Sequence, residues 1–172
     1  MSTARQIEKG PGKSRVATVV STIDELVGAH ERALEAIFMR NAPADPEALG
    51  ETPRGLLLTF AGTSQVHLAA REAIRLLSRG GAALWQGIHF DHGGNGGSHR
   101  FFGKSLVRFH AEHAASKLDA APALVLSYAK AGFPWGRLQG ELRTVGKGLA
   151  MGPVFFGGTV VAWVAFAASP RG

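Results

Sequence analysis

Apolar positions recur with helical spacing near the start of the chain, between residue 22 and about residue 40. Steps of three and four residues put these side chains on one face, which predicts an amphipathic helix that packs on a core. Thr22 and Glu25 resemble a capping box at its start, because hydroxyl and carboxylate can each bond a free backbone N–H. The expected inward stripe consists of Ile23, Leu26, Val27, His30, Ala33, Leu34, Ile37 and Phe38.

A second helical pattern extends from Gln65 to Ser78 and ends before Gly80-Gly81, which is typical of a glycine C-cap. Between the two helices, Asn41 to Gly50 carries two prolines and reads as a connector with one short turn. Arg54 to Phe60 then predicts a strand that is apolar on both faces.

From residue 82 onward the pattern changes to short strands separated by glycine-rich or proline-containing turns. Such spacing favours a sandwich or barrel over a parallel sheet, whose strands need helices between them. We therefore expect an α+β fold, with N-terminal helices followed by about six or seven antiparallel strands that close into a small barrel or half-barrel. The strands expected here are Ala83 to Phe90, His99 to Phe109, Pro122 to Tyr128, Leu138 to Val145, Leu149 to Phe156 and Thr159 to Ala167.

Composition limits the chain to one ordinary globular domain. It has 172 residues, an apolar fraction of 45% and a charged fraction of 19%. We expect a flexible basic arm over residues 1–20 and a single α+β barrel domain over residues 21–172. The absence of cysteine excludes disulfides, thiolate metal sites and a cysteine nucleophile.

The net charge of +6 raises the question of nucleic-acid binding. Half of it lies in residues 1–15, and the remainder of the chain has no dense basic stripe interleaved with aromatic residues. A solvated arm explains this distribution, so we expect no nucleic-acid partner. The apolar run Val16 to Val20 is too short for a signal-peptide core, which favours a cytoplasmic protein.

One uncharged stretch, Leu149 to Ala168, is long enough to cross a bilayer as a helix. Its glycines and its Phe, Val and Trp content favour strands instead. Gly157-Gly158 between two apolar runs indicates a two-residue hairpin. We therefore expect a β-hairpin and no membrane span.

A histidine-rich segment, His89 to His99, holds three imidazoles and one carboxylate among several glycines. These are ligand types for zinc or iron, but no helix fixes their spacing as in a metalloprotease motif. We interpret the segment as a solvated hairpin loop and expect no metal, and we interpret His110 and His113 in the same way. The glycines lack the context of a phosphate-binding loop, so no cofactor is expected.

Six residues in the strand region are candidates for contact with a ligand, and no nucleophile elbow accompanies them. Glu141 and Arg143 are two residues apart and share one face of their strand, opposite Leu142. Facing outward they form a solvated ion pair; facing inward they form a buried pair that can orient or protonate a ligand. The tryptophans fit either a core or a pocket lining. The candidates are Trp85, His89, Tyr128, Trp135, Glu141 and Arg143.

Four blocks of the chain resemble a group of uncharacterised bacterial proteins with a lipocalin-like fold. The resemblance extends over residues 20 to 168 and implies a lipocalin-like barrel, without an activity or a catalytic residue. Where that group has Trp-x-Gly-Lys this chain has Trp85-Gln-Gly-Ile88, and where the group has Arg-Asp-Glu-x-Arg this chain has Gln139-Gly-Glu-Leu-Arg143. The blocks are Leu84 to Phe90, Lys117 to Tyr128, Glu141 to Val145 and Gly148 to Gly152.

Small barrels either pack shut or keep room for one ligand. The last two strands are apolar on both faces, more than a closed core of this size requires, so helices or a second subunit of a homodimer must cover the surplus. The leading hypothesis is a protein that binds a small apolar molecule. One alternative is an isomerase or cyclase of the same fold, acting through Glu141, Tyr128 or His89. Another is an interaction module that uses the C-terminal hairpin.

Overall fold

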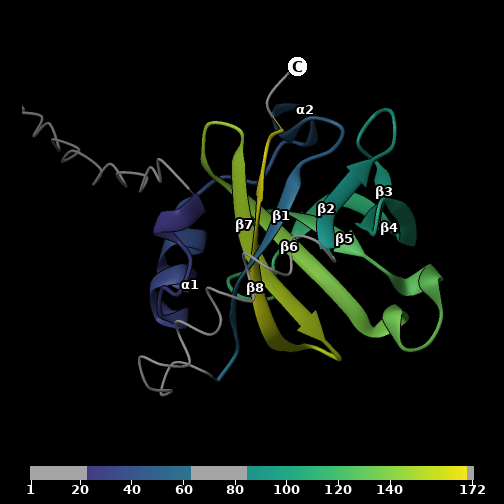
Figure 1. Cartoon of the computed structure of the whole chain (residues 1–172). Helices are drawn as coiled ribbons and strands as arrows, with labels where there is room; N and C mark the ends of the chain where they lie inside the picture. Colours follow the sequence, from purple (N-terminus) through teal and green to yellow (C-terminus); the bar gives the residue numbers. More distant parts are fainter. Residues whose placement is uncertain (1–22, 63–84, 170–172) are drawn as a thin grey trace, which may run out of the picture.

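The computed structural model describes residues 23–62 and 85–169. The expected arm over residues 1–20 and the expected helix from Gln65 to Ser78 lie outside these ranges. Within them, eight strands form one antiparallel sheet in the order β1-β8-β7-β6-β5-β4-β3-β2. From β2 to β8 each strand pairs with its neighbour in sequence, and β1 pairs with β8, which gives an up-and-down barrel (Figure 1). The strands are β1 (Arg54–Phe60), β2 (Trp85–Phe90), β3 (Gly96–Phe101), β4 (Lys104–Ala115), β5 (Pro122–Ser127), β6 (Leu138–Gly146), β7 (Leu149–Phe156) and β8 (Thr159–Ala167).

The two edge strands, β1 and β2, meet and bring the sheet close to full closure. The amide of Phe90 donates to the carbonyl of Glu51 at 2.8 Å, and the amide of Ile88 donates to that of Pro53 at 3.3 Å. Gly87, with φ +112, lies where a Cβ would approach the Pro53 carbonyl oxygen to 2.3 Å. A glycine in a strand often marks such a close approach. The space beside this glycine is therefore filled by the backbone of residues 53–55, at the start of β1.

The barrel prediction is confirmed, but eight strands replace the expected six or seven. The predicted strand His99 to Phe109 is in fact two strands, β3 and β4, joined by the two-residue turn Phe102-Gly103. Both turn residues have positive φ, 51° and 75°, as a type I′ hairpin requires. Phenylalanine is rare in that conformation, so the sequence carries little signal for the turn.

The predicted helix over residues 22–40 is shorter and interrupted. A 3₁₀ turn, η1 (Ile23–Glu25), is followed by Gly28 with φ 73, and α1 (Glu31–Arg40) begins only after it. A positive φ ends helical geometry, which glycine tolerates without a steric penalty. His30 and Ala33, expected on the inward stripe, are exposed as a result.

Short helices also occur later in the chain, so the expectation that all helices precede the sheet is wrong. The short helix of the connector, α2 (Pro46–Leu49), precedes β1 and agrees with the turn expected there; it is capped by the side chain of Asp45, which accepts from the Glu47 amide at 2.9 Å. Two 3₁₀ turns, η3 (Ala129–Ala131) and η4 (Trp135–Arg137), lie between β5 and β6.

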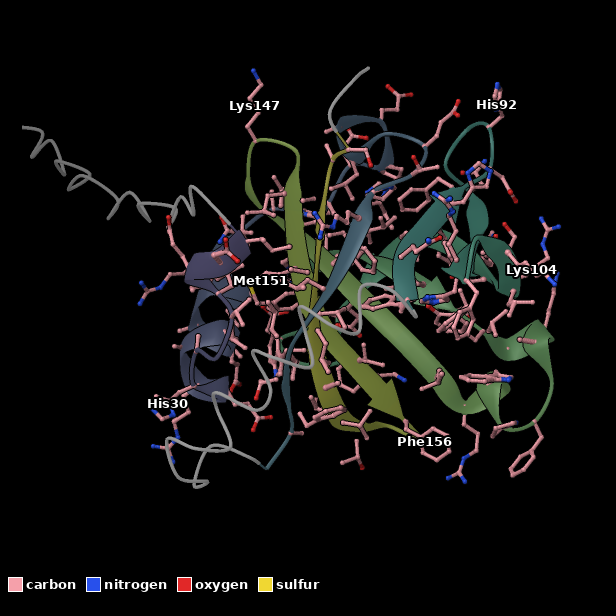
Figure 2. All side chains as sticks on the ribbon, viewed as in Figure 1. His30, His92, Lys104, Lys147, Met151 and Phe156 are labelled. Atoms are coloured by element: carbon pink, nitrogen blue, oxygen red, sulfur yellow. The ribbon has the colours of Figure 1, made fainter. Side chains whose placement is uncertain are left out.

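The sheet buries apolar side chains on both faces because α1 covers the outside of the barrel (Figure 1). Phe38 of α1 packs against Trp163 of β8, with ring centroids 6.0 Å apart, and Met151 of β7 lies in the same outer layer (Figure 2). On the other face of β8, Val164 and Phe166 belong to the core inside the barrel. Much of the apolar surplus of the last two strands is thus buried in this outer layer, whereas Val161 of β8 stays 38% exposed.

The stretch considered as a membrane span forms β7 and β8, joined at Gly157-Gly158 with φ 60 and 90. The expected hairpin is confirmed. Among the residues described, no helix has the length and apolar character needed to cross a bilayer.

Candidate functional site

The barrel encloses a cavity of about 100 Å³. Its deepest wall is made by side chains of β5, β6 and β8, of which Leu142 is fully buried and Leu126 and Phe166 are 2% exposed. Trp135, from η4, is 42% exposed and also lines the cavity, so the cavity meets the surface beside this ring. The lining residues are Trp85, His99, Phe101, Val107, Leu126, Tyr128, Trp135, Leu138, Gly140, Leu142, Val154, Val164 and Phe166.

Three polar side chains on the described lining, those of Trp85, His99 and Tyr128, form one hydrogen-bonded chain. The indole Nε1 of Trp85 donates to Nδ1 of His99 at 2.9 Å. Nε2 of His99 lies 2.5 Å from the hydroxyl of Tyr128, and the His99 and Tyr128 rings stack at 5.4 Å between centroids. Phe109 flanks both rings at 5.9 Å. The apolar surroundings hold the three polar groups in one arrangement.

This chain of polar groups is uncharged near neutral pH. Burial lowers the pKa of His99 from 6.5 to about 4, because removal from water disfavours the imidazolium. Burial also raises the pKa of Tyr128 well above its usual range, since the phenolate would be desolvated. None of the described lining residues is an Asp, Glu, Lys or Arg. The cavity therefore presents an apolar wall with a neutral polar strip.

Three of the six candidate ligand contacts lie on this cavity: Trp85, Tyr128 and Trp135. His89 is on β2 but does not line it, because alternation along the strand directs Ile88 and Phe90 into the inner core instead. Glu141 and Arg143 are also elsewhere. They point out of the barrel, as the inward position of Leu142 on the same strand requires.

Glu141 and Arg143 face outward but are not in contact with solvent, so the expectation of a solvated ion pair is wrong. Glu141 is fully buried and Arg143 is 1% exposed, because α1 and the segment between β4 and β5 cover them. They do not bond each other: Arg143 pairs with Asp119 at 2.7 and 2.8 Å. The Arg143 guanidinium also lowers the pKa of the Asp119 carboxyl through these hydrogen bonds.

The remaining contacts of Arg143 are all to main-chain carbonyls. It donates to Phe38 at 3.1 Å, to Ala121 at 3.0 Å and to Pro122 at 3.0 Å. With the two bonds to Asp119, five hydrogen bonds match the five N–H donors of a guanidinium. Its plane also lies 4.3 Å from the ring centroid of Phe38. Arg143 therefore ties α1 and the loop after β4 to the outside of the barrel.

Glu141 fixes the same loop from its other end. Its carboxylate accepts from the Ser116 hydroxyl at 2.5 Å, from the Lys117 amide at 2.9 Å and from the Gln139 side chain at 3.0 Å. A carboxylate with three donors is satisfied without water. We call Glu141, Arg143, Asp119 and Ser116 the outer cluster.

His99 is a lining residue that is missing from the six candidates; the sequence analysis has it at the end of a solvated loop and at the start of the predicted strand His99 to Phe109. His99 lies within β3. The exposed part of the segment is the tip of the β2–β3 hairpin, where His92 projects into solvent (Figure 2). The signal was present: alternation from Phe101 puts His99 on the same face as that aromatic residue. Alternation does not show that this face is the inner one, because that depends on the pairing of β3 with β2 and β4.

Within the described part of the chain, no group of three or more His, Asp or Glu side chains is placed to hold a metal ion. His110 lies on β4 with Glu112 at 3.9 Å, and His113 bonds the Ala44 carbonyl at 3.1 Å. Asp91, in the glycine-rich loop, pairs with Arg108 at 2.8 Å.

No protein-family model matches the chain, and no curated protein matches it. Among solved structures, the fold is similar to the crystal structure of a protein from Thermomonospora curvata, with a TM-score of 0.56 and 14% sequence identity. The match covers 86% of this chain and 93% of that one. At this identity the similarity concerns the fold alone, and it agrees with the barrel described above.

Proposed function

We propose that this protein binds a small, neutral, apolar molecule inside the barrel. The observation that carries the proposal is a cavity of about 100 Å³ whose described lining is mostly apolar and contains the hydrogen-bonded chain of Trp85, His99 and Tyr128. Ligand sites are typically of this kind, with a mostly apolar wall and a few convergent polar groups.

The cavity volume sets the scale of the ligand. An engineered apolar cavity of about 150 Å³ accommodates benzene. A cavity of about 100 Å³ suits a molecule of that size or smaller, or the apolar end of a longer molecule. In the second case the rest of the ligand leaves the barrel beside Trp135, which is partly exposed.

Two observations favour binding over the enzyme alternative. Glu141, the strongest candidate acid, lies in the outer cluster, with three donors on its carboxylate. The two titratable groups on the described lining have pKa values displaced away from neutrality in opposite directions, so neither exchanges a proton readily near pH 7. The interaction-module alternative is less favoured because α1 packs over the hairpin's outer face.

A titration with benzene, followed by the indole N–H signals in ¹H–¹⁵N spectra, tests the proposal. We expect the signals of Trp85 and Trp135 to shift with a stoichiometry near one, because both rings line the cavity. Trp163 provides an internal control, since it is buried in the outer layer beneath α1. Equal shifts of all three signals indicate general partitioning and contradict a defined site.

Gly140 offers a graded way to fill the cavity from within. An added Cβ there meets Leu126 side-chain atoms at 3.6 to 3.8 Å, which is ordinary contact. Gly140→Ala and Gly140→Val should therefore reduce benzene affinity in that order, while the free energy of unfolding changes by about 1 kcal/mol or less for the alanine. Undiminished affinity in Gly140→Val would place the bound benzene elsewhere. Native mass spectrometry of the purified protein then identifies a ligand that co-purifies.

A further inference from the structure

The hydrogen bond from Trp85 determines which ring nitrogen of His99 carries the proton. An indole N–H can only donate, so Nδ1 of His99 must be the unprotonated acceptor of their 2.9 Å hydrogen bond. A neutral imidazole carries one proton, and that proton must then reside on Nε2. Burial favours the neutral ring, which agrees with the lowered pKa of His99.

This tautomer decides the direction of the next hydrogen bond. Nε2–H of His99 donates to the hydroxyl oxygen of Tyr128, 2.5 Å away. The hydroxyl proton of Tyr128 cannot return to His99, because Nε2 has no free lone pair in this state. Within the part of the chain that the structure describes, no acceptor for this proton is recorded, although Tyr128 is only 5% exposed.

A buried O–H donor without an acceptor is unfavourable, because folding removes it from water without replacing the hydrogen bond that water supplied. Water satisfies such a group well only where two to four polar partners surround it. Here the neighbouring polar atoms of the described lining, on Trp85 and His99, are already engaged with each other and with the Tyr128 oxygen. A water molecule beside Tyr128 would therefore lie against an apolar wall and be held by one strong bond.

We propose that the ligand carries a neutral oxygen acceptor, such as a ketone, aldehyde, ester or ether oxygen, which accepts the hydrogen bond of the Tyr128 hydroxyl. This inference rests on the proposed function and specifies its ligand class. An anionic acceptor fits poorly, because none of the described lining residues supplies a positive charge and burial of an unpaired carboxylate is strongly unfavourable. Trp85 and His99 act as positioning residues, since they orient the Tyr128 proton without contacting the acceptor.

A matched pair of probes separates the contribution of the ligand's oxygen acceptor to affinity from that of its apolar part. Cyclopentanone and methylenecyclopentane have the same shape, and each has six heavy atoms, but only the ketone has an oxygen. Both are titrated against the wild type and Tyr128→Phe, with the Trp85 indole signal as the readout. We expect Tyr128→Phe to weaken cyclopentanone binding roughly fivefold, the usual scale for one hydrogen bond, and to leave methylenecyclopentane binding nearly unchanged.

Two other outcomes separate the acceptor inference from the proposed function. If both probes bind and Tyr128→Phe affects them equally, the acceptor inference is wrong and the apolar site remains. If neither probe moves the Trp85 signal, the proposed function fails and the inference fails with it. A cooperative urea transition for Tyr128→Phe confirms that the comparison is made between folded proteins.

A second variant tests the positioning role even if Tyr128→Phe does not fold. Trp85→Phe keeps an aromatic ring but removes the indole donor, so His99 can carry its proton on Nδ1 and accept from Tyr128 through Nε2. We expect the preference for cyclopentanone, followed by the Trp135 indole signal, to fall although Tyr128 is intact. Imidazole ¹⁵N shifts should report Nε2–H in the wild type and Nδ1–H in the variant. An Nδ1–H tautomer in the wild type would overturn the proposal.

Discussion

Two buried clusters of polar side chains, on opposite faces of the barrel wall, differ in how many of their donors and acceptors are hydrogen-bonded. In the outer cluster, Arg143 makes five hydrogen bonds and Glu141 accepts three. On the cavity side, the Tyr128 hydroxyl accepts from His99, and its own proton has no recorded acceptor among the described residues. A fully bonded charge indicates a structural role, whereas the Tyr128 proton borders a cavity and is free to bond a ligand there.

The two sites also differ in how closely their surroundings are packed. Around Arg143 the ring of Phe38 and three main-chain carbonyls lie within contact distance. Around Tyr128 the barrel leaves a cavity of about 100 Å³. Substitutions in the outer cluster should therefore change stability, and substitutions at the cavity should change binding more than stability.

The largest effect is expected for Arg143→Met. Removal of the guanidinium leaves Asp119 without its charged partner and takes one donor from each of three carbonyls, of which those of Phe38 and Ala121 keep a main-chain donor. Breaking a buried pair in this way costs about 3 to 5 kcal/mol. Urea unfolding measures the loss. Arg108→Met is the matched control, because the pair of Arg108 with Asp91 is exposed and should contribute about 1 kcal/mol or less. Equal costs for both variants would contradict a structural role for the outer cluster.

Glu141→Gln should have a smaller effect of about 2 kcal/mol. The amide keeps one oxygen for the Ser116 hydroxyl or the Lys117 amide but presents an NH₂ group to the other donor. Glu112→Gln, on an exposed position of β4, is the control. Benzene affinity should be the same in wild type and Glu141→Gln. A loss of affinity without a loss of stability would return Glu141 to the list of ligand contacts.

The smallest effect concerns acid pH and the cavity side. The folded-state pKa of His99 is lowered from 6.5 to about 4, so the unfolded chain binds a proton more readily. Stability is then fully present above about pH 6.5 and falls towards about pH 4, by at most about 1.4 kcal/mol per pH unit. Between about pH 7 and about pH 5.5 we expect a loss of roughly 1 kcal/mol in urea unfolding. This loss of unfolding free energy on acidification should be smaller in His99→Gln, which lacks the titrating imidazole.

The acid response of the outer cluster falls in a different range. The pKa of Asp119 is lowered from 3.8 by its bonds with Arg143, so its contribution is retained above about that pH and lost below it. For His99, an unfolding free energy of the wild type that does not change between neutral pH and about pH 4 would contradict a buried neutral imidazole.

Local pattern was sufficient for most of the sheet. Short apolar runs and turn glycines located β1, β7 and β8 at their observed bounds, because such signals involve only neighbours in sequence. The same reasoning gave Trp85, Tyr128 and Trp135 as ligand candidates. It failed at Phe102-Gly103, where a residue that disfavours positive φ forms the turn, and at Gly28, where a positive φ ends an apolar period that continues in the sequence.

What the sequence by itself determined is which residues share a face: Glu141 with Arg143 on one side of β6, and Leu138, Gly140 and Leu142 on the other. What only the tertiary structure decided is what covers each face. The outer face of β6 is buried because α1 and the loop around Asp119, both distant in sequence, close over it. His99 meets Trp85 across the β2–β3 hairpin, but its contact with Tyr128, which follows β5, joins strands that are not neighbours in the sheet. Period-two alternation assigns a side chain to a face, but burial and bonding depend on contacts between segments far apart in the chain.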